Sequence, residues 1–586
     1  MAGFSKSSEN EKVAPASAER QSIDSGASHF SEGSQTLAGG AHQHKYEKGA
    51  VPTYGGLMGD KLIWAITASA SCGFGLFGYD QGVMSGIISA PQFFRVLPTL
   101  SPEVSGDYQS SVLQAFIVAI YEAPILRRFG LLQIGCLAGA IFALGFGDRL
   151  GRRKMMVTGV AIMCIGVIIQ ITTMKDHSAF AQFTIGRIVT GLGNGMNTAT
   201  IPTWHAETAK AHNRGLLICI EASMISTGTA ISYWIDLGFS YIDNSISWRV
   251  PIGLQMIFAA GLVASVAFLP ESPRWLLANG QKEEGQRVIG ALEPAPIESE
   301  LVITQTKVII DSLEGSVQPK KSDVLTNGPT QHLRRALLGA SSQVMQQIGG
   351  CNAVIYFAPV IFQQNLNLSR ELSLILGGVN VTIYAISSGI AFYTIERVGR
   401  RILFLVGSAG QALSMFIIMA FLIPGSDNLI KGSVFGIFLY LAFFGFTWLQ
   451  LPWIYPAEVN PLATRTNANA LSTICNWLFN FAVVMWTPPM LTAINWGTFL
   501  FFGVLNVLFI PFIWVFYPET AGRTLEEIDC IFARAYVEKR PYVKVAAEMP
   551  KLTEQEIEQE WKRLGLTGEV EGPRGLKDAR DLPSIA

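Results

Sequence analysis

The sequence GDRLGRRK at residues 147–154 and the sequence IERVGRR at 395–401 decide the fold. Each has an acidic residue four positions before an arginine, and each precedes an apolar run long enough to cross a bilayer as a helix. The acid of the first sequence precedes Glu207 by 59 residues, and the acid of the second precedes Glu458 by 62. The same order at nearly the same spacing predicts two homologous halves, an arrangement that is common in transporters.

Further apolar runs occur on both sides of these sequences. A run of about 20 residues can cross the roughly 30 Å hydrocarbon core of a bilayer as a helix. A polar stretch from Glu271 to Arg335 divides the runs into two groups of six. The sequence therefore predicts an all-α integral membrane protein of 12 transmembrane helices in two six-helix bundles. The spans are expected near 62–86, 112–147, 155–174, 179–203, 215–237, 250–269, 336–362, 372–395, 402–423, 432–455, 467–490 and 495–517.

The composition agrees with a membrane protein. Of 586 residues, 49% are hydrophobic and 15% are charged, whereas a soluble domain has about 25% charged residues. The net charge of −1 argues against a nucleic acid partner. No group of cysteine and histidine residues has metal-ligand spacing, and no nucleophile–base pair or phosphate-binding loop is visible. We therefore expect no metal, no cofactor and no enzymatic activity.

Positive charge is concentrated on alternate loops. The sequences at 147–154 and 395–401 are rich in arginine, whereas the loops at 238–247 and 424–431 have almost no basic residues. The positive-inside rule then places both termini and the central polar stretch in the cytosol. We divide the chain into a disordered cytosolic tail (1–60), a first bundle (61–270), a cytosolic linker with short helices (271–335), a second bundle (336–530) and a cytosolic C-terminal tail (531–586).

Eight ordered motifs resemble those of the sugar porter family of the major facilitator superfamily, which implies the major facilitator fold. Besides GDRLGRRK and ERVGRR, they are GYDQGVMSG (78–86), GRIVTGLGNG (186–195), PESPRW (270–275), QQIGGCN (346–352), PWIYPAE (452–458) and PETAGR (518–523). Within this family the chain is most similar to the fungal glycerol/proton symporters. That likeness is carried by SYWIDLGFSY (232–241), CNAVIYF (351–357) and CNWLFNFAVVMWTP (475–488), although related fungal proteins carry pentoses or hexoses.

Asp80 lies inside the first apolar run. A carboxylate at bilayer depth costs a few kcal/mol, so it should face a cavity or a cationic partner. The resemblance implies that Asp80 binds the transported proton and pairs with Arg187 of the fourth span. The alternatives are an Asp80 at the aqueous end of its helix and an Arg187 that only binds backbone carbonyl groups.

Amide side chains predict a polar stripe in the seventh span. Amides both donate and accept hydrogen bonds, as the hydroxyl groups of a sugar or polyol do. The resemblance implies that the stripe binds the substrate, although amides also join helices to one another. The expected substrate-binding residues are Gln346, Gln347 and Asn352, with Asn380 and Asn476 on other spans and Trp453 as a flat apolar surface; Trp477 is a weaker candidate, since tryptophan is often an interfacial anchor.

One position departs from the family pattern. The glutamine ligand that sugar porters have in the fifth span is replaced by Ala222, and the preceding residue is Glu221. Either the substrate site, with Glu221 in it, is reshaped for a smaller or different polyol, or Glu221 is a second protonatable group. The change favours glycerol or a pentose over a hexose.

The charged residues next to the loops recur at matching positions in the two halves. The resemblance implies that they form salt bridges across the two bundles and close the cytosolic side, and the alternative is solvated positive-inside charge. The expected gating residues are Arg152, Arg153, Glu207, Arg214, Glu396, Arg400, Glu458 and Arg465.

The second span contains an interruption. Residues 112–122 and 134–146 together would make one span, but the 11 residues at 123–133 separate them and include Arg127 and Arg128. Each arginine at mid-bilayer would cost about 2.5–3.5 kcal/mol. We expect residues 123–133 to be a gene-model artefact, such as retained intron sequence, or a variant that impairs folding. Mature transcripts that still contain the 33 extra bases, as shown by sequencing, would contradict the interpretation as an artefact.

Together these features predict a monomeric, multi-pass plasma-membrane transporter that imports a sugar or polyol with protons. A proton-independent sugar facilitator is the nearest alternative. The resemblance argues against it, because facilitators of this family usually lack the aspartate that Asp80 matches. A non-transporting sugar sensor is a second alternative, but such proteins tend to have a much longer cytosolic tail. The partners expected are therefore the solute, protons and the lipid bilayer.

Overall fold

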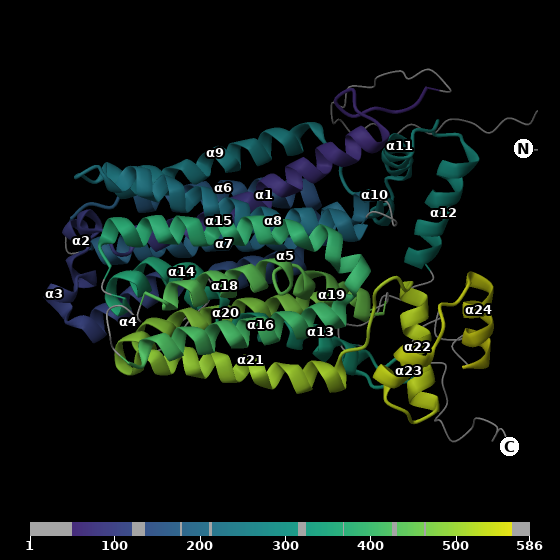
Figure 1. Ribbon diagram of the computed structural model, residues 1–586. Coiled ribbons are helices and arrows are strands. Elements are labelled where there is room, and N and C mark those ends of the chain that lie inside the picture. The colour runs from purple at the N-terminus through teal and green to yellow at the C-terminus, as the bar shows by residue number, and fades with distance from the viewer. Residues whose placement is uncertain are drawn as a thin grey trace, which may run out of the picture. The chain divides into compact units, whose positions relative to one another are not determined.

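The computed structural model describes residues 50–119, 135–175, 178–209, 214–314, 324–366, 368–424, 431–461 and 464–564. These residues belong to one compact unit built from helices that run side by side (Figure 1). Most of the tail predicted at 1–60, and all of the interruption predicted at 123–133, lie outside the described residues.

The helices follow the predicted order. Those of the first half are α1 (Gly59–Ile87), α2 (Pro91–Val96), α3 (Pro102–Ser105), α4 (Asp107–Ala119), α5 (Gly135–Leu150), α6 (Arg152–Ile171), α7 (Ala179–Thr208), α8 (Arg214–Ser240) and α9 (Ile246–Phe268). The middle of the chain holds α10 (Pro273–Ala278), α11 (Lys282–Leu292) and α12 (Glu300–Glu314). The second half holds α13 (His332–Ile348), α14 (Cys351–Val360), α15 (Arg370–Val398), α16 (Arg400–Leu422), α18 (Ser433–Phe446), α19 (Leu451–Val459), α20 (Arg465–Ile494) and α21 (Trp496–Phe516). The helices α22 (Leu525–Val537), α23 (Tyr542–Glu548) and α24 (Glu554–Arg563) follow.

Ten helical segments among the described residues are long and apolar enough to cross a membrane. They correspond to ten of the predicted spans, and the other two predicted spans correspond to α7 and to the pair α4 and α5. Large apolar side chains are exposed on the outer faces of these helices, such as Ile257 of α9, Ile386 of α15 and Leu508 of α21. Such exposure suits contact with lipid, where burial against other protein is not required.

Two spans that the sequence predicts as continuous are broken. The span predicted at 336–362 stops at Ile348 and restarts at Cys351, because Gly350 adopts φ +95°, which side-chain-bearing residues rarely adopt. The carbonyl freed at Gly349 accepts hydrogen bonds from Tyr440 Oη and Asn506 Nδ2, both at 2.9 Å. These bonds replace the lost helical ones, as a break at bilayer depth requires.

The second break lies in the span predicted at 432–455. Helix α18 ends at Phe446 and α19 begins at Leu451, with Pro452 in its first turn. Proline cannot donate a backbone hydrogen bond and is therefore favoured where a helix begins. In α19 the indole of Trp453 then turns toward the interior between the two halves.

Small residues allow the helices of the first bundle to approach closely. A Cβ atom on Gly78 of α1 would lie 1.9 Å from the carbonyl oxygen of Ile225 of α8, and one on Gly228 would lie 2.1 Å from that of Gly75. Side chains at these positions would force the helices apart, so α1 and α8 pack backbone to backbone. Between the bundles, α8 packs on α15, and α4 and α5 pack on α20.

The short helices α10–α12 and α22–α24 lie at one end of the long helices, and α2 and α3 lie at the other (Figure 1). We call the first of these the charged end, because the arginine-containing turns at Gly151 and Gly399 are also there. The segment before α1 was predicted as disordered up to residue 60. It contacts α11, because Tyr54 Oη donates to Glu284 of that helix at 2.6 Å. Helices α22–α24 likewise extend beyond the predicted boundary at 530.

Candidate functional site: two arginine clusters and a buried polar core

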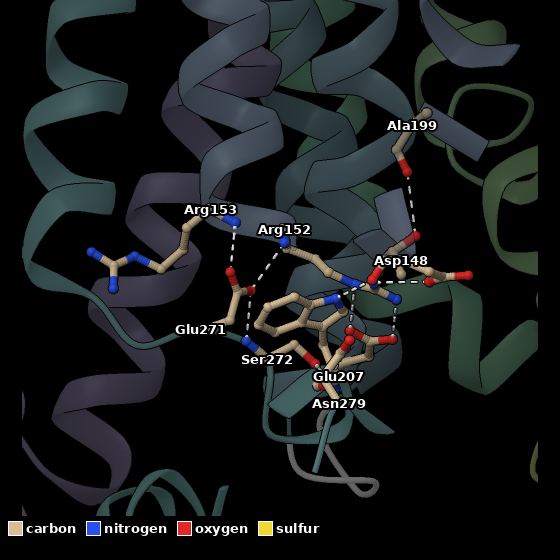
Figure 2. Close-up of polar contacts among 10 residues, drawn as sticks. Asp148, Arg152, Arg153, Ala199, Glu207, Glu271, Ser272 and Asn279 are labelled. Carbon is tan, nitrogen blue, oxygen red and sulfur yellow. Dashed lines mark hydrogen bonds and ion pairs between the residues drawn. The ribbon is translucent and has the colours of Figure 1, made fainter. Parts of the chain in front are cut away.

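The first arginine cluster (Asp148, Arg152, Glu207 and Glu271) joins α5, α6 and α7 to the segment before α10. Arg152 donates from Nε and Nη2 to the two carboxylate oxygens of Glu207, both at 3.1 Å, and from Nη1 to Asp148 at 3.1 Å. Glu271 accepts from the backbone N–H groups of Arg152 and Arg153 at 3.1 and 3.0 Å (Figure 2). A carboxylate at this place caps α6, because the first N–H groups of a helix have no partner within it.

The second cluster (Glu396, Arg400, Glu458 and Glu519) repeats this arrangement in the other half. Arg400 donates from Nε and Nη2 to Glu458 at 3.2 and 2.7 Å, and it binds Glu396 at 2.6 Å. Glu519 accepts from the first two backbone N–H groups of α16 at 2.8 and 3.1 Å. The side chain of Arg400 is only 4% exposed. The repeat that the sequence predicts is therefore present as a repeated set of contacts.

These contacts differ from the expected bridges across the bundles. The pairs of Arg152 and of Arg400 join residues of one half each. Arg153 donates to the carbonyl groups of Val266 and Ala267, and Arg465 donates to that of Asn460. The physical reason is that the carboxylates nearest to Arg152 and Arg400 belong to the same half as the arginine, and they already occupy its donor groups. The side chain of Arg214 is outside the described part of the chain.

We expect Gly151→Ala to lower the thermal stability of the detergent-purified protein. Gly151 has φ +84°, and a Cβ atom there would lie 2.9 Å from the capping carboxylate of Glu271. A residue with a side chain in this region costs about 1–3 kcal/mol. Gly253→Ala on α9, where no atom lies within 4 Å of the added Cβ, is the matched control and should leave the unfolding temperature nearly unchanged. Equal unfolding temperatures for the two variants would contradict the strained cap.

Amide side chains from α13, α14 and α20 form a connected network. Asn476 Nδ2 donates to Gln343 Oε1 at 2.5 Å and to Gln346 Oε1 at 3.0 Å. Asn352 Nδ2 donates to Gln347 Oε1 at 2.5 Å and also binds Asn480. The predicted polar stripe is therefore present, and its members also join helices to one another, so the two interpretations of these amides are compatible.

A cavity of about 30 Å³ lies beside this network, between the two halves, and we call it the central cavity. By volume it has room for about two water molecules. Five predicted substrate-binding residues line it, whereas Asn380 and Glu221 do not. The lining residues are Phe77, Gln81, Ile225, Gln346, Gln347, Cys351, Asn352, Ile355, Tyr384, Phe444, Leu449, Trp453, Asn476 and Asn480.

The predicted residues outside the lining, which are Asn380, Glu221 and the weaker candidate Trp477, are all buried. Asn380 of α15 is fully buried, and neither its amide oxygen nor its amide nitrogen has a hydrogen-bond partner among the described residues. Trp477, the weaker tryptophan candidate, is also fully buried and packs edge-on against Phe77 with ring centroids 5.5 Å apart. The sequence does not show which side of a helix faces the cavity, because the neighbouring helices are not known from it.

Asp80 and Arg187 form a buried ion pair, with Arg187 Nη1 3.0 Å from Asp80 Oδ1. The two side chains are 0% and 2% exposed, so the pairing that the resemblance implies is present in the geometry. The second carboxylate oxygen of Asp80 has no hydrogen-bond partner among the described atoms. The next residue on α1, Gln81, lines the central cavity, whereas Asp80 and Arg187 do not.

Glu221 lies within the first bundle and not at the cavity. Its Oε2 is 2.9 Å from Nδ1 of His205 of α7, and Nε2 of His205 is 3.0 Å from Oγ1 of Thr67 of α1. The sequence analysis did not single out His205. His205 lies two residues beyond the span predicted at 179–203, and its separation of 16 residues from Glu221 gave no indication of contact.

A charged pocket at the end opposite the clusters was also not predicted from the sequence. Asp236 of α8 is 5% exposed, and its two carboxylate oxygens have no hydrogen-bond partner among the described residues. It lies against Gly86, and a pocket of about 10 Å³ beside it is also lined by Arg370 of the second half. The signal was the carboxylate within SYWIDLGFSY, the sequence at 232–241.

Known proteins similar to this chain are transporters. The family model described as "Sugar (and other) transporter" matches residues 65–532. "Sugar transporter STL1" of Saccharomyces cerevisiae is 44% identical over 87% of this chain and 88% of its own length. "Major facilitator superfamily transporter mfsA" of Aspergillus fumigatus is 42% identical over 88% of this chain and 94% of its own length.

A solved structure agrees with these relatives. The structure of the major facilitator superfamily proton:xylose symporter XylE matches with a TM-score of 0.67 at 26% identity, over 80% of this chain and 99% of that chain. The fold is therefore the all-α major facilitator fold with 12 transmembrane helices in two six-helix bundles, and the relatives are transporters rather than enzymes. This chain belongs to the sugar transporter family of the major facilitator superfamily.

Proposed function

We propose that this transporter imports a small polyol or sugar together with protons by alternating access. The observation that carries the proposal is the buried Asp80–Arg187 ion pair. Asp80 directly precedes Gln81, which lines the amide-lined central cavity. A buried pair is stable while both partners are charged, and removal of either charge leaves the other uncompensated. Proton binding to Asp80 would therefore free Arg187 and change the packing of α1 against α7.

The cavity lining supports a hydroxylated solute. The second bundle contributes five amides that lie where they can donate to and accept from hydroxyl groups, namely Gln346, Gln347, Asn352, Asn476 and Asn480. The first bundle contributes Phe77, Gln81 and Ile225, of which only Gln81 is polar. The mostly apolar first-bundle side offers few partners for hydroxyl groups, and Ala222 replaces the glutamine that sugar porters have in the fifth span; both support a short polyol such as glycerol, or a pentose, over a hexose.

The charged end is proposed to face the cytosol. The arginine-rich turns before α6 and α16 lie there, and basic residues are retained on the cytosolic side of membrane proteins. This orientation makes both termini cytosolic. The two arginine clusters would then hold the helices of each bundle together as rigid bodies while the bundles move. We further propose that the protein acts as a monomer in the plasma membrane.

The proposal is tested by uptake of labelled glycerol, xylose and glucose in a yeast strain that lacks its own transporters. We expect uptake of at least one solute, alkalinisation of the medium as the solute enters, and loss of accumulation when a protonophore is added. Uptake that a protonophore leaves unchanged would instead establish a proton-independent facilitator. No uptake of any solute, with the protein present at the cell surface, would favour the sensor.

A further inference from the structure

The His205–Glu221 pair joins three helices of the first bundle at a position that the proposed mechanism does not use. Glu221 belongs to α8, His205 to α7 and Thr67 to α1. The side chains of His205 and Glu221 are 1% and 2% exposed. Oε1 of Glu221 has no hydrogen-bond partner among the described residues. An acid and an imidazole are thus held in contact at bilayer depth, where ionisable groups are costly and usually serve a function.

The hydrogen bonds of this group restrict where its protons lie. Thr67 Oγ1 donates its single proton to the carbonyl oxygen of Ile63 at 2.9 Å. If the hydroxyl keeps this bond, it accepts from Nε2 of His205, which then carries a proton. If the hydroxyl donates to Nε2 instead, the ring proton lies on Nδ1. Nδ1 of the ring then faces Oε2 of Glu221 at 2.9 Å, and one proton is required between them.

That shared proton decides the charge of the pair. With Nε2 protonated and the shared proton on either atom, the pair is neutral overall, as imidazolium and carboxylate or as imidazole and carboxylic acid. Without it, two lone pairs would face each other and one negative charge would be buried without compensation, which costs several kcal/mol. In this conformation the pair therefore retains one proton.

Other charged groups near the pair are already compensated. On α7 the nearest acid, Glu207, is bound by Arg152, and on α1 no ionisable residue lies between Lys61 and Asp80 except Cys72 and Tyr79. On α9 the basic residue is Arg249, near the opposite end of that helix. From the second bundle, Glu396 and Glu458 are close enough to Cys219 of α8 to interact with it electrostatically. Both are bound by Arg400.

The pair lies between the Asp80–Arg187 pair and the charged end. Thr67 and Asp80 are 13 residues apart on α1, which corresponds to about 20 Å along a helix. In the other direction, Glu207 of the first arginine cluster is only two residues beyond His205. A proton that travels from Asp80 to the charged end passes this depth of the bundle.

Glu221 is also close to the contact between the bundles. Two residues farther along α8, Ser223 Oγ accepts from Gln450 Nε2 at 3.3 Å, and Ser226 Oγ is 3.0 Å from Ser388 Oγ. Gln450 and Ser388 belong to the second bundle. Separation of the bundles at the charged end would break these contacts and admit water to the face of α8 that carries Ser223 and Ser226, at the depth of Glu221.

We propose that His205 and Glu221 form a second proton-binding site, which receives the transported proton and releases it when the bundles separate at the charged end. This inference rests on the proposed proton symport. The site binds a proton only, so no solute needs to reach it. Glu221 and His205 act together, since neither retains the proton without the other.

The test compares two assays on purified protein in liposomes. Net uptake driven by a proton gradient requires proton release at each turnover, whereas exchange of labelled for unlabelled solute does not. In Glu221→Gln, the new amide can donate to Nδ1 of His205, so the contact is retained without an exchangeable proton. We expect exchange to stay near the wild-type rate and gradient-driven uptake to fall by about tenfold or more, because proton transfer loses its relay group.

His205→Gln is the second variant and should show the same change in the ratio of the two rates. Ser69→Ala on α1 is the matched control, because it removes the 2.7 Å hydrogen bond to Ser265 of α9 but no ionisable group. Its ratio should equal that of the wild type. Size-exclusion chromatography identifies which variants are folded, and the ratio is read from those.

The outcomes separate this inference from the proposed function. A wild-type uptake rate that does not depend on the proton gradient would overturn the proposed symport and, with it, this inference. Gradient-driven wild-type uptake combined with an unchanged ratio in the folded Glu221 or His205 variants would overturn the second site alone. An equal loss in both assays would show that the pair only supports the packing of α1, α7 and α8.

Discussion

Asp80→Asn is expected to abolish accumulation of the solute above its concentration in the medium. Asparagine cannot take up and release a proton, so the fully buried partner of Arg187 no longer responds to the proton gradient. One proton that moves through about 100 mV supplies about 2.3 kcal/mol, which sustains roughly 50-fold accumulation. The measurement is the steady-state ratio of internal to external labelled solute, with and without a protonophore.

The control for this prediction is Asp60→Asn. Asp60 lies in the exposed first turn of the same helix, so the substitution changes the charge equally but away from the cavity. It should leave accumulation at the wild-type level. Asp80→Asn that still accumulates solute, and loses this accumulation when the protonophore is added, would refute Asp80 as the proton-coupling group.

Asn352→Leu should raise the KM for the transported solute strongly. Leucine has a similar volume, but it removes the amide that binds Gln347 and Asn480 beside the central cavity. An unsatisfied buried polar group costs about 1–3 kcal/mol, which corresponds to a roughly 5- to 150-fold increase in KM if the solute meets the same deficit. The measurement is the initial uptake rate as a function of solute concentration.

Asn380→Leu is the matched variant. It replaces an equally buried amide of α15 that does not line the cavity and has no hydrogen-bond partner among the described residues. We expect a much smaller change in KM, since no hydrogen bond is lost. If the two variants raise KM equally, the central cavity is not the solute site, and a position near Asn380 becomes the better candidate.

The repeated arginine clusters have a simple consequence for transport. Each cluster fixes the helices of one bundle, since Arg152 and Arg400 bind acids of their own half and the capping acids Glu271 and Glu519 bind the starts of α6 and α16. Between the bundles the described contacts near the charged end include neutral ones, such as those of Ser223 and Ser226. Neutral hydrogen bonds are weaker than charge-assisted ones, so the interface can open while each bundle stays intact.

The sequence by itself determined the number and order of the spans, the two halves and the presence of buried polar residues within the spans. These follow from local properties, because a run of apolar residues must form a helix in a bilayer and a charge within it must find a partner. The pairing of Asp80 with Arg187 came from the resemblance to a family, since 107 residues separate the two.

Only the tertiary structure decided which side chains meet. The break at Gly350, the place of Asn480 in the amide network and the contact of Glu221 with His205 all depend on which helix faces are neighbours. Helical periodicity gives each residue an angle around its own axis but does not give the rotation of one helix against another. Packing of small residues, such as Gly78 against α8, sets that rotation, and it is a property of the assembled bundle.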